Sequence, residues 1–235
     1  MNVIRPLFAD RQQAGRELVS RLSNLRDSGA IVYALPRGGV PVAVEIARAL
    51  SLPLDLLYVR KIGAPFQPEL ALGAIVDGND PDFVINEALV RRLGITPETL
   101  GELKKVELAE IERRRQRYGK ALATPLTPTG RPAIVVDDGL ATGATVRAAV
   151  QALRRRGATR VIVAVPVAPP DAVADLEAAG AEVVCPHICE PFFGVGNFFH
   201  DFRQLSDQDV VALLVAFRDS ANGVHRAKSY RGTTH

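Results

Sequence analysis

The chain has 235 residues, and 47% of them are hydrophobic, which is enough for one large domain or for one domain with a sizeable insertion. A formal net charge of +3 and the absence of tryptophan argue against a nucleic-acid-binding surface. No apolar run approaches the roughly 20 residues that a membrane-spanning helix needs. The first residues lack the apolar core of a signal peptide, and two cysteines make no disulfide framework, so we expect a cytoplasmic protein.

The first third of the chain alternates helical and strand patterns. Leucines at helical spacing predict a covering helix over residues 10–28, and the apolar run 30–35 predicts a strand. The loop Arg37-Gly38-Gly39 follows and leads into a helix near Pro41, because proline suits a first helical turn. A glycine-rich loop between a strand and a helix is typical of an anion site, and an arginine adds positive charge there. The alternative is a plain turn.

A further strand, residues 54–59, is followed by Arg60 and Lys61. Open α/β sheets bind their ligands outside the carboxyl ends of the strands, so these two cations are candidates for contacting a phosphate group. The alternative is a solvated basic pair. Residues 69–76 and 83–86 predict two more strands.

Residues 97–118 predict a long, charged helix with Pro97 at its first position and only a thin apolar stripe. Its arginine run, residues 113–115, is interpreted as a solvated helix face in preference to a nucleic-acid patch. The next segment, 119–132, is rich in proline, glycine and threonine, and we expect it to be irregular.

Residues 133–145 hold the most informative pattern of the chain. A short apolar run ending at Val136 predicts a buried parallel strand, and two carboxylates follow it directly. A loop of small and polar residues then opens into a helix, whose first amide N–H groups favour a phosphate group. The carboxylates would repel that phosphate, so we expect them to bind sugar hydroxyls or an accompanying metal ion. The candidate residues are Asp137, Asp138, Gly139, Leu140, Ala141, Thr142, Gly143, Ala144 and Thr145.

The last third continues the alternation of strands and helices. It predicts strands at 160–165 and 181–185 and helices at 146–157 and 171–179. Strands that alternate with helices predict an α/β fold with a mainly parallel sheet flanked by helices.

The pattern of residues 134–145 resembles the signature of type I phosphoribosyltransferases, which bind phosphoribosyl pyrophosphate (PRPP). The resemblance implies the fold of that family and a transfer of ribose 5-phosphate from PRPP to a nucleobase-like or other nitrogenous acceptor, with release of pyrophosphate. It further implies Mg²⁺ as cofactor, PRPP and a small-molecule acceptor as partners, and a homodimer. No specific salvage enzyme of the family is matched, so the acceptor stays open.

The resemblance also assigns roles to residues. Asp137 and Asp138 would clamp the ribose hydroxyls and approach the metal ion directly or through water, and Lys61 would join them as a catalytic residue. The 5′-phosphate would lie on residues 141–145. The pyrophosphate would contact Arg37, Gly38, Gly39, Arg60 and Lys61. In this family the loop at residues 37–39 often carries a strained or cis peptide, and segment 119–132 is our candidate for the mobile loop.

On this basis we expect one phosphoribosyltransferase domain over residues 1–219. It would carry a helical insertion at about 77–132 and a small hood at about 186–205 over the acceptor site, and residues 220–235 would form a flexible tail.

Aromatic residues concentrate in the expected hood, and Phe192, Phe193 and Phe199 are candidates for stacking on the acceptor. The alternative is that these rings close the core. Nearby cysteines and histidines match no strong zinc pattern in their spacing.

Two other functions use the same fold. In the first, the chain is a non-catalytic PRPP-sensing regulator whose basic helix 97–118 binds a partner. In the second, it is a binding or scaffolding protein with a vestigial site. The presence of both acids together with Arg37 and Lys61 favours catalysis.

Overall fold

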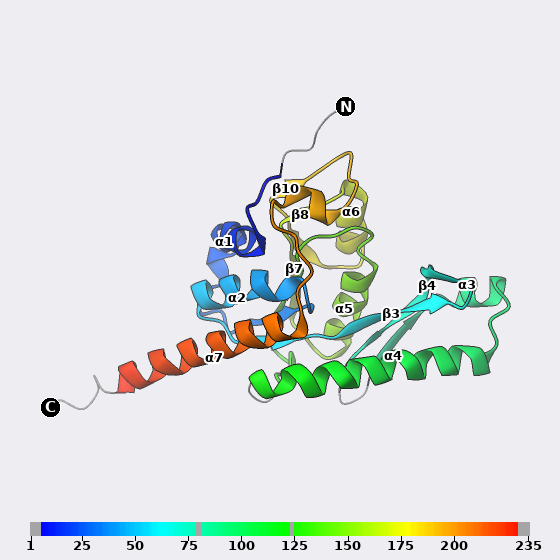
Figure 1. Ribbon diagram of the computed structural model, residues 1–235, viewed down its shortest axis with the longest axis horizontal. Helices are drawn as coiled ribbons and strands as arrows, with labels where there is room; N and C mark the ends of the chain where they lie inside the picture. The colour runs from blue at the N-terminus through cyan, green and yellow to red at the C-terminus, as the bar shows by residue number, and fades with distance from the viewer. Residues whose placement is uncertain (1–5, 79–80, 123–124, 230–235) are drawn as a thin grey trace.

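The structure is a computed structural model that describes residues 6–78, 81–122 and 125–229 (Figure 1). A five-stranded sheet in the order β2-β1-β6-β7-β9 lies at its centre, and every neighbouring pair of strands in it is parallel. The predicted α/β fold with a mainly parallel sheet is therefore confirmed. The strands are β1 (Ile31–Ala34), β2 (Leu54–Leu56), β6 (Pro132–Val136), β7 (Arg160–Ala164) and β9 (Glu182–Val184).

Helices cover both faces of this sheet, which explains why its central strands are apolar throughout. On one face lie α1 (Arg11–Arg21), α2 (Gly39–Leu50) and the start of α7 (Asp207–Ser229). On the other lie α5 (Ala144–Arg155) and α6 (Pro170–Ala178). The helices that follow the neighbouring strands β1 and β6 thus lie on opposite faces. Such a divergence is where open α/β sheets bind ligands.

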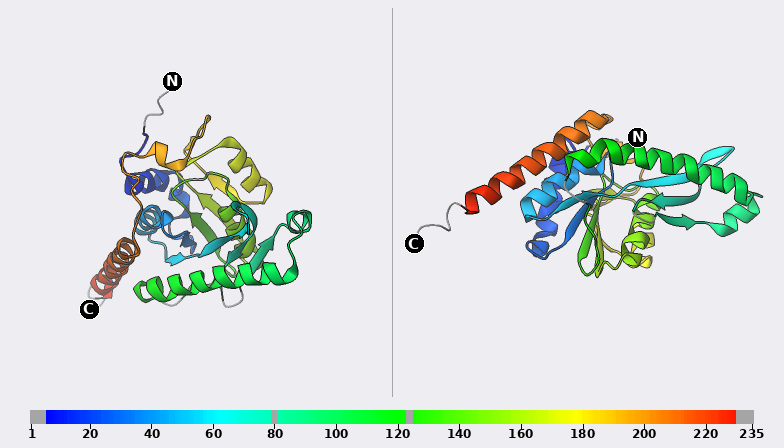
Figure 2. Two further views of the ribbon diagram at one scale, coloured as in Figure 1. Left: turned by 45° about the vertical axis from the view of Figure 1, so that its right-hand side comes forward. Right: turned by 90° about the horizontal axis from the view of Figure 1, so that it is seen from below.

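Between β2 and β6 the chain leaves the sheet and builds an extension, which projects to one side (Figure 2). Strands β3 (Val59–Ala64), β4 (Gln67–Val76) and β5 (Asp82–Ile85) form an antiparallel sheet. Helices α3 (Glu87–Arg92) and α4 (Pro97–Tyr118) and the short 3₁₀ turn η2 (Gly119–Ala121) complete the extension.

The extension corrects two expectations. The predicted strand 54–59 is two strands, because β2 ends at Leu56 and the hairpin begins at Val59. The insertion accordingly starts at β3 rather than near residue 77. Both faces of the hairpin are buried, since Leu72 packs beside α4 and Val76 beside α5. Its sequence is therefore apolar without alternation, like that of a central strand.

A small cap lies beyond the carboxyl end of the central sheet. It contains β8 (Val167–Ala168), β10 (His187–Ile188) and the 3₁₀ turn η3 (Val195–Phe198). The N-terminal segment joins this cap, since the backbone of Phe8 bridges to Phe199 and the two rings pack together. A further 3₁₀ turn, η1 (Ser23–Leu25), follows α1, so the predicted helix 10–28 is shorter than expected.

The C-terminal helix α7 continues to Ser229, past residue 219 where we expected the folded domain to end. The rest of the expected flexible tail, residues 230–235, lies outside the described residues. Residues 125–131 have no regular structure, as predicted. Within the described ranges, no helix combines the length and the apolar character needed to cross a membrane.

Candidate functional site

Two loops meet at the carboxyl ends of β1 and β6. The strands pair in parallel with Ala34 opposite Val136, and the Leu35 amide donates to the Val136 carbonyl at 2.9 Å. This pairing places residues 36–39 beside residues 137–143. A Cβ atom on Gly38 would overlap the Asp138 carboxylate, so glycine is required for this close approach.

The loop after β6 exposes a row of backbone donors. Among the described residues, the amide N–H groups of residues 141–145 donate no hydrogen bond. Gly143 directly precedes α5, has φ +66° and gives no side-chain cap, whereas Asp10 caps α1 and Thr96 caps α4. Unpaired amides at a helix N-terminus form an anion site.

The loop after β1 offers a second, smaller set of donors. The amides of Arg37 and Gly38 have no acceptor in the part of the chain that the structure describes, and no side chain caps α2. The peptide bond between Pro36 and Arg37 is cis, one bond before the steps at 37–39 where we expected such a peptide.

Two residues of the predicted phosphate loop contact the cap. The Leu140 side chain is buried, and its amide donates to the Val167 carbonyl at 2.9 Å. Gly139, at φ +154°, packs so closely on Val195 of the cap that a Cβ atom would lie 2.6 Å from it. Gly139 and Leu140 therefore anchor the loop to the cap, and their contact with PRPP stays a prediction.

The two carboxylates lie between the amide sets. Asp137 Oδ1 accepts the Asp138 amide at 2.9 Å, and Asp138 Oδ2 accepts the Arg11 Nε–H at 2.7 Å. Burial, reinforced by the neighbouring Asp138 charge, raises the pKa of Asp137 well above its ordinary value. Burial also raises the pKa of Asp138, and the hydrogen bond from Arg11 opposes that rise.

Arg11 was not among the residues proposed from the sequence. Its Cζ atom lies 3.9 Å from the Phe202 ring centroid, and its Nη1 donates to the Arg203 carbonyl at 3.1 Å. It thereby ties α1, the acid pair and the chain after the cap into one cluster. The contact joins residues that are 127 positions apart, so no local pattern marks it.

Arg37 lies near a carboxylate that was also not among the residues proposed from the sequence. Its Nη1 is 3.9 Å from Asp207 Oδ1, at the start of α7. The same carboxylate lies 3.3 Å from Arg113 Nη1 and 3.2 Å from Arg117 Nε, and the Tyr118 hydroxyl donates to it. The Tyr118 hydrogen bond, followed by that from Arg113, lowers the pKa of Asp207. The first loop, α4 and α7 are therefore connected through Asp207.

Arg60 and Lys61 do not follow the end of a central strand as predicted. They belong to β3, opposite Ile75 and Ala74, because the hairpin has already begun. Arg60 Nε donates to Glu107 Oε2 of α4 at 2.6 Å, which leaves its charge neutralised. Lys61 is exposed and remains a candidate for the pyrophosphate.

The three phenylalanines proposed for the acceptor differ in accessibility. Phe199 is only 4% exposed and packs on Phe8, so it closes the core and is withdrawn from the acceptor set. Phe192 is half-buried and stacks on Phe198, while Phe193 is 73% exposed.

The donor set fits Mg²⁺. Asp137 and Asp138 supply adjacent carboxylates, and within the described residues no group of three or more metal-binding side chains occurs. Magnesium ions are commonly held by one or two carboxylates, with waters and substrate phosphates supplying the remaining ligands. These two residues would hold the ion only together with a phosphorylated ligand.

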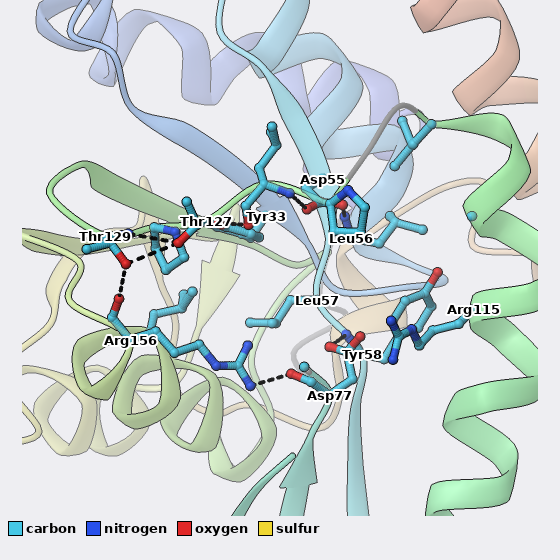
Figure 3. A pocket seen from close by; sticks show the side chains of 17 residues that line it. Tyr33, Asp55, Leu56, Leu57, Tyr58, Asp77, Arg115, Thr127, Thr129 and Arg156 are labelled. Atoms are coloured by element: carbon cyan, nitrogen blue, oxygen red, sulfur yellow. Dashed lines mark hydrogen bonds between the residues drawn. The ribbon is translucent and has the colours of Figure 1, made fainter. Parts of the chain in front are cut away.

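Two cavities accompany the site. One of about 380 Å³ lies beside Arg11 and is lined by the start of α1, by Pro41, by residues after the cap and by α7. A larger one of about 630 Å³ lies between the central sheet and α4 (Figure 3), and no residue of the two loops lines it.

Comparisons with known proteins show the family of the chain. The family model "Phosphoribosyl transferase domain" matches residues 9–193. "Putative phosphoribosyl transferase Rv0571c" of Mycobacterium tuberculosis H37Rv is 47% identical over 217 residues, covering 92% of this chain and 48% of that protein. The counterpart MT0597 of strain CDC 1551 gives the same values. The chain thus spans about half the length of the curated relatives it matches.

A solved structure shares the fold over nearly the whole chain. The crystal structure of TT1426 from Thermus thermophilus has a TM-score of 0.77 and 39% sequence identity, covering 89% of this chain and 98% of that one. The family model spans everything from α1 to the cap, including both loops and the acid pair. The chain belongs to the phosphoribosyl transferase domain family.

Proposed function

We propose that the protein transfers ribose 5-phosphate from PRPP to a nitrogenous acceptor and releases pyrophosphate, with Mg²⁺ as cofactor. One observation carries the proposal: two sets of unpaired backbone amides flank a pair of carboxylates where the connections after β1 and β6 diverge. PRPP has phosphate at both ends of a ribose, which matches this order of groups.

The residues divide the work in a simple way. The amides of 141–145 bind the 5′-phosphate, and the carboxylates accept hydrogen bonds from the ribose hydroxyls. The bond from the anomeric carbon to pyrophosphate breaks with its electron pair on the leaving oxygen, and an acceptor nitrogen forms the new bond and loses a proton. Negative charge from Asp137 and Asp138 favours the cationic transition state, and Arg37 and Lys61 stabilise the leaving group. Mg²⁺, when bound, neutralises charge on the pyrophosphate.

The cavity beside Arg11 is our candidate for the acceptor position. Arg11 lies between the cavity and the acid pair, because it lines the cavity and also contacts Asp138. Apolar side chains from Pro41, Leu205 and Leu213 offer a surface for a flat ring, and the exposed Phe193 remains a second candidate.

Pyrophosphate release from PRPP, measured with a panel of purines, pyrimidines and simple amines, tests the proposal. We expect release with at least one acceptor and none from the Asp137→Asn/Asp138→Asn variant, which keeps its fold by circular dichroism. PRPP binding without release for any acceptor would favour the sensing alternative. We also propose a homodimer, which mass measurement in solution would check.

A further inference from the structure

The larger cavity is bounded by four parts of the fold. Its walls come from β1 and β2, from the end of β4, from α4 and from the segment before β6 together with the end of α5. Its volume of about 630 Å³ falls within the usual range for small-molecule sites. No residue of the loops 36–39 and 137–145 lines it, whereas residues 125–129, part of our candidate for the mobile loop, do.

Most of its polar groups are already paired. Asp55 accepts the amides of Leu56 and Leu126, each at 2.8 Å, so both of its oxygens are occupied. Arg156 is paired with Asp82 at 2.9 Å and also donates to the Asp77 carbonyl. The Tyr33 hydroxyl donates to the Leu126 carbonyl at 3.0 Å.

Three polar side chains of the lining have a group without a hydrogen-bond partner among the described residues: the hydroxyl of Tyr58, one carboxylate oxygen of Asp77 and the guanidinium of Arg115. Asp77 is 9% exposed and accepts the Tyr58 amide with Oδ1, while its Oδ2 has no hydrogen-bond partner among the described residues. Arg115 is half-buried and makes no ion pair or hydrogen bond within the same set of residues. Figure 3 shows Arg115 reaching from α4 toward Tyr58 and Asp77. An acceptor and a donor are therefore available at one end of the cavity.

The charges of the lining select against phosphate. Asp55 and Asp77 offset Arg115 and Arg156, and Asp82 already neutralises Arg156. The cavity thus lacks the excess of positive charge and free amides found at the two loops. A zwitterion would have to lose the hydration of two charges, whereas a neutral ligand would not.

The remaining walls suit a flat ring. Rings of Tyr33, Tyr58, Pro125 and Pro128 line the cavity together with several leucines. Aromatic and apolar walls favour a heteroaromatic body, and a lactam edge places an N–H donor beside a carbonyl acceptor.

We propose that this cavity is a second ligand site, specific for a neutral heteroaromatic base with a lactam edge, whose N–H donates to Asp77 and whose carbonyl accepts from Arg115. The site shares no residue with the two loops after β1 and β6, so base binding is expected not to require the acid pair.

Isothermal titration of the full chain with uracil, hypoxanthine and inosine tests the proposal, with leucine as a zwitterionic probe and inorganic pyrophosphate as an anionic one. We expect saturable binding of at least one lactam compound. Asp77→Asn and Arg115→Gln should each weaken it by about tenfold or more, since each removes one charge-assisted hydrogen bond. Asparagine can still accept the Tyr58 amide, so the fold should survive.

Two controls make the result specific. Arg114→Gln changes the neighbouring residue of α4, which pairs with Glu110 and does not line the cavity, and should leave base binding unchanged. Asp137→Asn/Asp138→Asn should also leave it unchanged. The proposal is overturned if no lactam compound binds, if only leucine or pyrophosphate binds, or if the acid-pair variant abolishes base binding. Failure of PRPP turnover alone would leave the expected base binding intact.

Discussion

The Nε atom of Arg11 lies 2.7 Å from Oδ2 of Asp138, and their side chains are only 10% and 14% exposed. Asp138 is one of two adjoining carboxylates, and burial raises the pKa of both by disfavouring their charged forms. The ion pair with Arg11 opposes this effect at Asp138. Arg11 is therefore expected to keep Asp138 ionised and oriented.

Arg11→Gln tests that role. Without the guanidinium the pKa of Asp138 should rise further, so PRPP binding at neutral pH should weaken by about 10- to 100-fold and recover as the pH is raised. Titration calorimetry with PRPP between about pH 6 and pH 9 measures this, a range that brackets neutral conditions. Arg16→Gln, on the same helix and 57% exposed, is the control. Superimposable pH profiles for wild type and Arg11→Gln would refute the role.

Gly38 and Gly101 form a matched pair of glycines. Gly38→Ala would drive a methyl group into the Asp138 carboxylate, so we expect PRPP affinity to fall by about tenfold or more. Gly101 lies inside α4 with open space around its Cα, so Gly101→Ala should stabilise the protein by about 1 kcal/mol. Urea unfolding and PRPP titration of both variants give the comparison. Full PRPP affinity in Gly38→Ala would contradict the close packing of the two loops.

Asp77 predicts a pH dependence of stability. Burial raises its pKa to about 6, above the ordinary value, so the folded state holds the proton more tightly than the unfolded chain. The stabilisation of the folded state by this tighter proton binding is complete below about pH 4. It is lost as the pH rises through about 6. Asp77→Asn should therefore gain stability relative to wild type between about pH 4 and pH 8, by up to about 3 kcal/mol.

Urea unfolding of both proteins across that range measures the difference. Asp175→Asn, an exposed position on α6, is the control and should follow the wild type. A difference between Asp77→Asn and wild type that stays constant with pH would show that Asp77 does not titrate there.

Asp207 joins α7 to α4 and to Arg37. Asp207→Asn removes the charge that faces three guanidinium groups and should destabilise the protein by about 1–3 kcal/mol. The exposed Asp219→Asn, further along α7, should have almost no effect. Urea unfolding at pH 7 checks both. Equal stability of the two variants would mean that the cluster around Asp207 is not structurally important.

Features with local causes could be predicted from the sequence. Helix α4 has the predicted bounds because the Thr96 side chain accepts the Thr99 amide and Pro97 begins the helix. The strand and loop at 133–145 are similarly local, since an apolar run ends and small residues begin there.

Features that depend on distant partners could not be predicted. β2 and β3 are separate strands, and between them the Tyr58 amide donates to Asp77 at 3.0 Å. The apolar run over 54–59 does not reveal this contact with a distant residue. Asp207 and Arg11 likewise acquire their roles only from contacts with α4 and with the loop after β6. Phe199 resembles any hood aromatic in sequence, and its burial follows from Phe8.

The pairing of β1 with β6 has one more consequence for turnover. Neighbouring strands lie about 4.8 Å apart, so the two loops that we propose to bind phosphate are held at a spacing that neither loop sets alone. In the reaction that we propose, a substrate with phosphate at both ends would engage both loops together and gain the advantage of bivalent attachment. Once the bond between its halves breaks, each product would be held by a single loop. The same spacing of the two loops would therefore favour binding of the intact substrate and release of the two products.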